Sequence, residues 1–531
     1  MFRDLDALTS HTFDLLVVGG GIHGLMAAWD GASRGLHVAL IERQDFGGAA
    51  SFHHHRTLHG GLRYLQSANV PRLQESARER HAWARMAPHL IERQMFAVPA
   101  GGPGGKSALL LRAGFALDAA LTPGRNRGLP DHLHLPAGRL VEGEERAALD
   151  TGTLLEDRPL GVWHDYRTAH AERLTFGVAI AAVRAGAVLA NYVDAIEPIR
   201  QGRIIAGVVA RDHVDGAMLS INARVLLNAT GSSAGRLMGA FGVRRTPQLV
   251  KALNMVTRRA APAVACGAPT ADGRLLFALP WQGRLSIGTW HGAEPCGADA
   301  AMVTPEEFDA FLTGVNQAFP NLALAADEVT LVQRGVVPAA GLGPHVTLAD
   351  RPLLREHRHD GVDGAISMMG VKYTTARALA ERAVTLAMAQ LGAHAPSTTA
   401  DSPLPGHAPT GSPPPVMGLD QDAWDHLQRV YGDQATRVAS MVQASPTLGR
   451  RLVEGLPIVG AQIVEAARNE MALTLEDIVL RRTGLGSAAY PGDEAILQVE
   501  SIARDELGWN SSRVQAEIQG LKEFYLPVHL D

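Results

Sequence analysis

The chain has 531 residues, which is enough for more than one domain, and its 46% apolar and 19% charged residues are ordinary for a globular enzyme. The formal net charge of -5 and a pI near 6.5 give no basic surface, so nucleic acid is excluded as a partner. Two cysteines, Cys266 and Cys296, stand in no metal-ligand spacing, so we expect no metal site, no disulfide framework and a reducing compartment.

A β-α-β unit is predicted over residues 15–42, where an apolar run, a glycine-rich turn, an alanine-rich helix and a second apolar run follow one another. In the turn, Gly19 makes the tight bend, Gly21 lets the backbone approach a pyrophosphate, and Gly24 lets the helix pack on the strand. Glu42 ends the second strand, where its carboxylate can accept hydrogen bonds from ribose hydroxyls. The unit therefore predicts a bound dinucleotide. The glycines do not separate NAD from FAD, but a position near the start of a long chain is typical of flavoproteins.

The next stretch, Gly47–Gln66, reads GGAASFHHHRTLHGGLRYLQ. Its small residues and second glycine pair predict a loop that lies against a flat, bulky group. Basic and aromatic side chains are crowded beside that loop, namely Arg56, His59, Arg63 and Tyr64. The motif HGGLRYL, together with GGGIHG and ERQDF before it, resembles the FAD-dependent glycerol-3-phosphate dehydrogenase family, the flavin group related to the amino-acid oxidases.

An apolar helix is predicted over Ser107–Leu121, with Lys106 before it and Arg112 within it. We favour a buried core helix, and contact with a membrane surface is the alternative. The first residues carry acidic side chains and no apolar core, so they do not form a secretory signal, and no apolar run is long enough to span a bilayer. We therefore expect a cytoplasmic protein, bound at most peripherally to the inner face of a membrane.

The resemblance continues along nearly the whole chain, with its motifs in the family's order. The matched segments are RLQESARERHAWARMAPHLI (72–91), ARVLLNATG (223–231), FALPWQGRLSIGT (277–289), MMGVKYTTAR (368–377) and EMALTLEDIVLRRTGLGS (470–487). Several matched motifs in order are far more specific than any one of them.

The resemblance implies an α/β fold, in which a Rossmann-like FAD-binding domain is interleaved with an antiparallel-sheet substrate domain and followed by a C-terminal helical domain. A proline-rich stretch with little apolar content is expected to be a linker. The predicted segments are 13–93, 169–235 and 335–392 for the FAD-binding domain, 94–168 and 236–334 for the substrate domain, 396–415 for the linker and 419–531 for the helical domain.

The activity that the resemblance implies is oxidation of a secondary alcohol, sn-glycerol 3-phosphate or a related small hydroxy compound. Hydride would pass to flavin N5, and the electrons would go on to a quinone or a soluble acceptor. The cofactor-binding residues that we expect are Gly19, Gly21, Ile22, His23, Gly24, Glu42, Arg43, Ser51, His59, Gly60, Gly61, Val193, Ala229, Thr230, Gly231, Gly370, Lys372 and Thr374.

Arg63 and Tyr64 are expected in the active site, with Lys372 beside the flavin. Each also has a structural alternative, because Arg63 and Tyr64 could close a domain interface and Lys372 could lie on the surface. Three consecutive histidines, His53–His55, stand near the expected flavin. A covalent bond from one of them to the flavin is an alternative, although simple packing against the flavin is favoured.

The chain departs from the family pattern at the substrate. Val337 replaces an arginine that would hold the substrate phosphate, and losing such a contact costs about 1.5–3 kcal/mol. Arg334 or Arg56 could substitute for it. Asn254 replaces a histidine and cannot take up a proton near neutral pH.

The base that accepts the hydroxyl proton is therefore expected elsewhere. His291 replaces an acid of the family on the hairpin that should face the substrate, and a histidine can accept this proton while Arg63 holds the developing alkoxide. Packing beside Trp290 is the alternative role of His291, and Tyr64 or His59 is then the next candidate.

Two other functions stay open from the sequence. An amine or amino-acid oxidase of the same superfamily would need an arginine for a carboxylate or an apolar pocket for an amine. A flavin-binding protein without catalysis would tolerate the substituted substrate positions. The sequence also leaves open whether the protein forms a homodimer.

Overall fold

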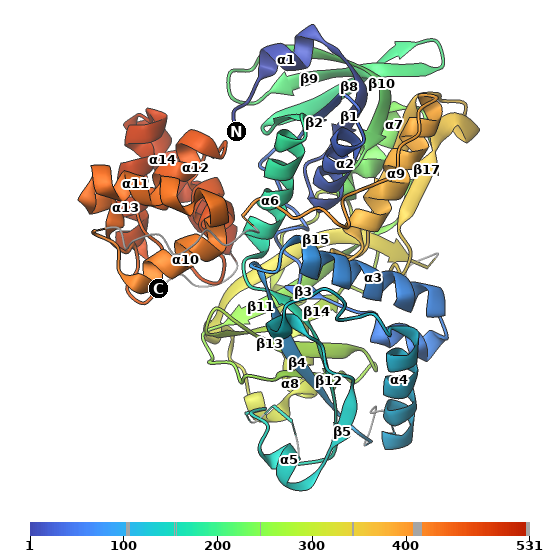
Figure 1. Ribbon diagram of the computed structural model, residues 1–531, viewed down its shortest axis with the longest axis vertical. Helices are drawn as coiled ribbons and strands as arrows, with labels where there is room; N and C mark the ends of the chain where they lie inside the picture. Colours follow the sequence, from blue (N-terminus) through green and yellow to red (C-terminus); the bar gives the residue numbers. More distant parts are fainter. Residues whose placement is uncertain are drawn as a thin grey trace.

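The computed structural model describes residues 1–101, 107–152, 154–155, 157–244, 246–341, 345–406 and 417–526. Two sheets form the body of the molecule, and a cluster of C-terminal helices lies to one side of it (Figure 1). The mixed α/β class with a separate helical domain is confirmed.

The first sheet is built on buried, mostly parallel strands. Leu15 and Val17 of its central strand point to one face and Leu16 and Val18 to the other, and all four are buried, as expected when both faces are covered. The strand order is β17 (Leu353–Glu356), β18 (Ala365–Met369), β10 (Met218–Asn228), β1 (Thr12–Val18), β2 (Val38–Ile41) and β7 (Val188–Ala190).

Different layers cover the two faces of this sheet. One face carries α2 (Ile22–Ser33), α6 (Ala171–Arg184) and α9 (Ala376–Gln390). The other carries β8 (Val193–Gln201), β9 (Ile204–Asp212), α1 (Leu5–Ser10) and α7 (Ala234–Ala240). The N-terminal half of β10 pairs with β9, so this arm is continuous with the sheet.

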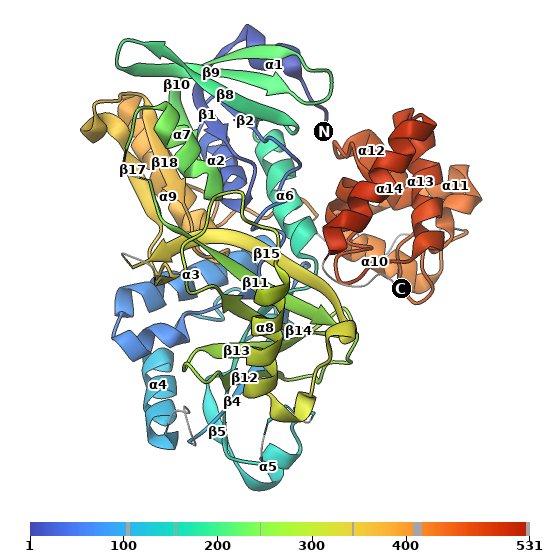
Figure 2. The same ribbon diagram turned by 180° about the vertical axis from the view of Figure 1, so that it is seen from behind.

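The second sheet is antiparallel except where β12 pairs with β4. Its order is β16 (Thr347–Leu348), β15 (Val329–Ala340), β11 (Leu249–Thr257), β14 (Arg284–His291), β13 (Leu275–Trp281), β12 (Ala265–Pro269), β4 (Ile91–Pro99), β6 (Leu160–Thr168) and β3 (Thr57–Leu58), with β5 (Arg139–Val141) on β6. Figure 2 shows α8 (Pro305–Ala318) in front of this sheet, where Phe311 and Val315 pack into its core. Two further helices, α4 (Ala108–Leu121) and α5 (Gly143–Ala147), lie in this part, whereas Trp83 and Met86 of α3 (Val70–Met86) belong to the core of the first sheet.

The C-terminal helices dock on the first sheet through buried ion pairs. Asp45 accepts hydrogen bonds from Arg481 Nε and Arg482 Nη2, each at 2.7 Å, and all three side chains are buried. Arg173 on α6 pairs with Glu470 at 2.7 Å. The elements are α10 (Gln421–Tyr431), α11 (Ala435–Ala444), α12 (Ala461–Asn469), the π-helix η9 (Asp477–Arg482), α13 (Asp493–Leu507) and α14 (Ser511–Tyr525).

The predicted domain limits differ from the sheets at two places. β3 and the start of β4 lie inside the predicted FAD-binding segment 13–93, but they pair in the second sheet. β15 runs from the predicted substrate segment 236–334 past residue 335. The predicted limits at residues 93 and 335 therefore fall inside strands of the second sheet, and composition gives no signal of where such a strand begins or ends.

The predicted linker is packed at some of its described residues and exposed at others. Ser397 and Thr399 donate hydrogen bonds to Asp30, and Leu404 is buried and donates its amide to Met86 O at 2.8 Å. Residues 397–406 contain no helix or strand, so the linker stays a prediction, but hydrogen bonds to Asp30 and Met86 hold this part of it against the first sheet's helices. Residues 407–415 lie outside the described residues.

The predicted core helix is wrong. In α4 only Phe115 is buried, while Leu109, Leu110 and Leu117 are 79%, 55% and 46% exposed. An apolar sequence favours a buried helix as long as the neighbouring elements are unknown. In the structure, one side of α4 is exposed. Lys106 lies outside the described residues. In the described part of the chain, no helix combines the length and apolar character needed to cross a membrane.

Candidate functional site

A cavity of about 1660 Å³ lies between the two sheets and is lined by both. The glycine turn after β1 forms one end, and β11, β14 and β15 supply the opposite wall. Glu476 and Phe524 of the C-terminal helices also reach it. All three parts of the fold therefore contribute to one site.

The glycine turn has the shape of a phosphate cradle. Gly19 has φ +108°, and a Cβ on it would lie 2.6 Å from Ala229 O, while a Cβ on Gly24 would lie 1.8 Å from Gly19 O. The chain's own packing thus requires both glycines. A Cβ on Gly21 would meet only Ser51 Oγ, at 3.3 Å, and would point into the cavity. Gly21 therefore keeps space for a ligand rather than for the protein.

Glu42 follows β2 and lines the cavity, where the sequence predicts a contact with ribose. Its Oε2 accepts from Gly20 N at 2.6 Å and its Oε1 from Gln44 N at 2.9 Å, and burial raises the pKa of this carboxyl. Each carboxylate oxygen keeps further acceptor capacity for a ribose hydroxyl. Arg43 and Val193 line the same part of the cavity.

Two cations meet at the other end of the cavity. Lys372 Nζ lies 4.2 Å from the centre of the Tyr64 ring, and Arg63 Cζ lies 5.3 Å from the same centre. Burial, with Arg63 and Arg72 nearby, lowers the pKa of Lys372 to about 7. Lys372 and Arg63 line the cavity, whereas Tyr64 is buried behind them. The surface alternative for Lys372 is therefore wrong, and Tyr64 supports the cations rather than facing the cavity.

His59 lies on the same side as Lys372. Its backbone N–H donates to Thr374 Oγ1 at 3.2 Å, and its Nδ1 is 3.3 Å from Asp165 Oδ2. Asp165 is buried on β6, and its other oxygen accepts from Gly60 N at 2.9 Å. Sequence reasoning missed Asp165, although a carboxylate in the middle of the strand VWHDYRT is a signal that could have found it.

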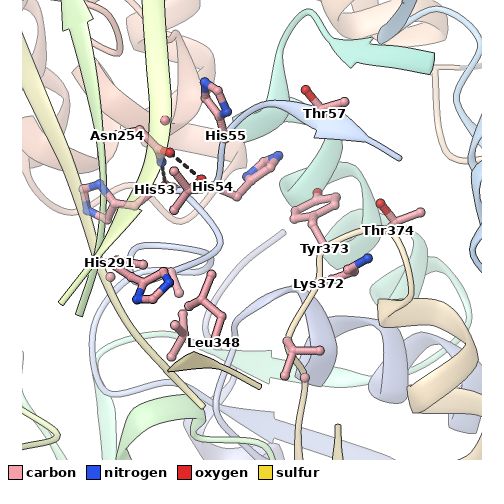
Figure 3. A pocket seen from close by; sticks show the side chains of 18 of the residues that line it. His53, His54, His55, Thr57, Asn254, His291, Leu348, Lys372, Tyr373 and Thr374 are labelled. Carbon is pink, nitrogen blue, oxygen red and sulfur yellow. Dashed lines mark hydrogen bonds between the residues drawn. The ribbon is translucent and has the colours of Figure 1, made fainter. Parts of the chain in front are cut away.

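The three consecutive histidines all line the cavity. His54 stacks on Tyr373 with ring centres 4.2 Å apart, and its Nδ1 is 2.8 Å from Ser51 O (Figure 3). Burial lowers the pKa of His54 and of His55 to about 3, so both rings are neutral at physiological pH. His53 stacks on Phe524 at 5.7 Å. The three rings therefore form neutral, packed walls of the cavity.

Both polar groups of the Asn254 side chain form hydrogen bonds within the protein. Its Nδ2 donates to His53 O at 2.9 Å, and its Oδ1 accepts from Thr289 Oγ1 at 2.8 Å. Figure 3 shows the bond to His53 beside the histidine loop. This residue fixes the loop that carries His53.

His291 lines the cavity at the end of β14, but apart from the cations. Figure 3 shows it well separated from Lys372 and Thr374. Its Nδ1 is 2.8 Å from Gly292 O, and burial lowers its pKa. Trp290 stacks on Phe311, with ring centres 6.0 Å apart.

The two arginines that could replace the missing phosphate contact differ in their access to the cavity, because Arg334 lines it and Arg56 does not. Arg334 Nη1 donates to the carbonyls of Phe524 and Leu526, at 2.9 and 3.0 Å. Arg56 is buried against Glu172 at 2.7 Å and lies over the Trp281 ring. Arg56 therefore does not replace the guanidinium that Val337 lacks, whereas Arg334 lines the cavity beside Val337, and its role at the substrate stays a prediction.

Most of the predicted site residues meet in the cavity. The three exceptions, Gly24, Gly60 and Tyr64, pack directly behind its wall. The lining residues among those predicted are Gly19, Gly21, Ile22, His23, Glu42, Arg43, Ser51, His59, Gly61, Arg63, Val193, Ala229, Thr230, Gly231, His291, Gly370, Lys372 and Thr374. Glu476 and Phe524 were missed, and no local pattern marks them.

Comparisons with known proteins identify the family of the chain. The family model described as FAD dependent oxidoreductase matches residues 14–386, and the C-terminal domain of alpha-glycerophosphate oxidase matches residues 370–514. A glycerol-3-phosphate dehydrogenase from Synechocystis sp. is 28% identical, with 98% of each chain covered.

Solved structures share the fold. The glycerol-3-phosphate dehydrogenase from Bacillus halodurans, complexed with FAD, has a TM-score of 0.73 at 23% identity and covers 98% of this chain and 96% of its own. Glycine oxidase from Geobacillus kaustophilus has a TM-score of 0.53 at 19% identity, over 74% of this chain and 98% of its own. The glycine cradle, the ribose carboxylate and the cations fit FAD as the cofactor. The chain belongs to the FAD dependent oxidoreductase family.

Proposed function

We propose that this protein is a dehydrogenase that oxidises a small anionic secondary alcohol, with sn-glycerol 3-phosphate as the first candidate. One observation carries the proposal: Arg63 and Lys372 share one end of the cavity, and no carboxylate in the described part of the chain forms an ion pair with either. Two such cations suit an anionic substrate. The named relatives, which are glycerol-3-phosphate dehydrogenases over nearly this whole chain, support the same substrate.

The chain's own residues orient and bind, while bound FAD would supply the hydride acceptor. Arg63 holds the anionic group or the developing alkoxide, and Lys372 adds positive charge beside the flavin. The cavity wall of neutral histidines keeps water from the ring system. The amino-acid oxidase alternative would use Arg63 for a carboxylate, and its structural relatives are more distant.

Anaerobic mixing of the purified yellow protein with single substrates tests the proposal. Glycerol 3-phosphate should bleach the oxidised flavin band, whereas glycerol and neutral α-amino acids should not. The Arg63→Gln variant should lose about 10- to 100-fold in the rate constant at low substrate, because one charge-assisted contact is worth about 1.5–3 kcal/mol. Arg85→Gln is a matched control, since Arg85 is an exposed arginine paired with Asp401 outside the cavity.

Bleaching by an amino acid but not by glycerol 3-phosphate would establish the oxidase instead. No bleaching by any alcohol or amine would leave a flavin-binding protein without catalysis.

For the electron acceptor, the exposed face of α4 supports contact with a membrane surface and delivery of electrons to a quinone. Leu110 and Leu117 are exposed and also line the mouth of the cavity, so an apolar acceptor could approach there. A cytoplasmic protein held peripherally on the inner face of a membrane fits this arrangement.

Sedimentation with anionic liposomes at low salt checks this proposal. The wild type should co-sediment and Leu110→Asp should not, while Leu497→Asp, at another exposed leucine on α13, should behave as wild type. Absence of co-sedimentation by the wild type would leave a soluble acceptor.

A further inference from the structure

The buried carboxylate of Asp165 is surrounded by donors from three directions. Oδ1 accepts from Gly60 N at 2.9 Å and from Arg80 Nη1, and Oδ2 accepts from Trp163 Nε1 at 3.3 Å. The remaining neighbour of Oδ2 is His59 Nδ1, at 3.3 Å. Burial alone would raise the pKa of Asp165, but Arg80 and His59 outweigh it and lower the pKa to about 2. The carboxylate is therefore charged near neutral pH.

His59 is held from several sides but keeps one nitrogen free. Its backbone is tied to Thr374, and its ring lies 5.9 Å from Phe96 and 6.5 Å from Phe277. The side chain is 41% exposed and lines the cavity. No described residue hydrogen-bonds to Nε2. When Nδ1–H faces Asp165, the lone pair for a proton must be on Nε2.

We propose that Asp165 is a positioning residue that holds His59 as the general base of the alcohol oxidation. This inference rests on the proposed function. The hydroxyl proton of the substrate passes to His59 Nε2, the oxygen's electron pair forms the new C=O bond, and the C–H hydrogen leaves with its two electrons as hydride. Asp165 fixes the tautomer and stabilises the imidazolium that forms.

His291 lacks the features that define this pair. Its Nδ1 is 2.8 Å from a backbone carbonyl, that of Gly292, rather than a carboxylate, and it lies apart from Lys372 in Figure 3. His59 is joined through Thr374 to the segment that carries Lys372. The structure thus favours His59 over His291 as the base.

Other charged groups near His59 decide how the test is read. Apart from Asp165, these are Arg63 and Lys372 in the cavity and Arg80 behind the carboxylate, while the nearby ring of His55 is neutral. Lys372 titrates near pH 7 in the free protein. The pH profile is therefore measured at saturating substrate, where an anion would pair with the ammonium and keep it charged.

The experiment is anaerobic stopped-flow reduction of the FAD-loaded enzyme by glycerol 3-phosphate across pH. In the wild type the limiting rate should rise with pH to a plateau. Asp165→Asn places an amide donor against Nδ1 and favours the wrong tautomer, so the limiting rate should fall by about 10²-fold or more and the pH step should change. Asp165→Glu should recover part of the rate. Flavin content and substrate KM should change by less than about threefold.

Asp118→Asn is the matched control, because Asp118 lines the small cavity behind Asp165 and pairs with Arg125 at 3.0 Å. Its limiting rate and pH profile should match the wild type.

His59→Gln provides the second variant, with the same expected loss. If Asp165 acts through His59, then adding Asp165→Asn to His59→Gln should cost no further rate.

A flavin-loaded Asp165→Asn enzyme with wild-type rate and pH profile would overturn the inference. If that variant does not hold flavin, a wild-type rate in His59→Gln overturns it instead. Failure of the wild type to be reduced by any alcohol would overturn the proposed function, which is a separate outcome.

Discussion

Replacing Asp45 by asparagine should weaken the docking of the C-terminal helices on the cofactor domain. The carboxylate is buried between Arg481 and Arg482, and it also accepts from Asn191 Nδ2 at 3.0 Å. An amide leaves the buried guanidinium of Arg482 without its anion and removes one of the three carboxylates that pair with Arg481, a loss of about 3–5 kcal/mol in unfolding free energy. Glu476, which pairs with Arg481 at 2.6 Å, lines the cavity, so the affinity for FAD should fall as well.

The pH dependence of the unfolding free energy gives a second measure of how much Asp45 contributes to stability. Burial would raise the pKa of Asp45, but Arg482 and Arg481 lower it from 3.8 to about 2. A lowered carboxyl pKa stabilises the fold above the unfolded pKa, and this stability is lost as pH falls through the folded pKa. The wild type should therefore lose about 2 kcal/mol between pH 3.8 and pH 2 through this group, and Asp45→Asn should not.

Urea unfolding followed by circular dichroism and tryptophan fluorescence measures both effects, with Trp424 reporting from the C-terminal helices. Asp433→Asn is the control, because Asp433 forms an exposed pair with Arg184 at 3.3 Å and should change stability by less than about 1 kcal/mol. The reasoning is refuted if Asp45→Asn and Asp433→Asn lose the same small amount of stability.

Three further predictions concern the cofactor cavity. Gly21→Val should fold normally and lose flavin, because its side chain enters only the cavity. Gly24→Val should instead lose stability, because its Cβ would lie 1.8 Å from Gly19 O. Equal melting temperatures for the two variants would contradict this prediction. Sulfate should bind the FAD-loaded protein up to about tenfold more weakly per pH unit above pH 7, because Lys372 must take up a proton before it can pair with the anion. In the Lys372→Met variant, titrations at different pH values should show no such dependence of sulfate affinity on pH. Acid precipitation should release all the flavin to the supernatant, as expected if His54 only packs in the wall, and flavin fluorescence in the washed pellet would disprove this.

The first β-α-β unit could be read from the sequence because its signals are local. Gly19, Gly21 and Gly24 specify a turn whose geometry depends on adjacent residues, and Glu42 ends a strand of the same unit. Elsewhere, apolar composition alone did not predict whether a segment is buried. The helix Ser107–Leu121 looks like core by composition, yet its exposure depends on what the rest of the fold leaves uncovered.

The catalytic side of the cavity depends on long-range pairing. Asp165 meets His59 because β6 pairs with β3 across more than a hundred residues, and no spacing rule predicts that register. Phe524 reaches His53 from the last helix for the same reason. Residues matched to a family could be placed near the flavin from the sequence, but the partners that orient them could not.

The strand order of the first sheet also has a consequence for synthesis. β1 and β2 pair early, but β10 joins β1 only after residue 218 and β18 joins β10 only after residue 365. A nascent chain therefore carries one flank of β1 uncovered until β10 is made, and one flank of β10 uncovered until β18 is made. Pairing over such separations is slow and leaves strand edges exposed to aggregation. Expression in cells should accordingly depend on chaperones more strongly than the stability of the finished protein would suggest.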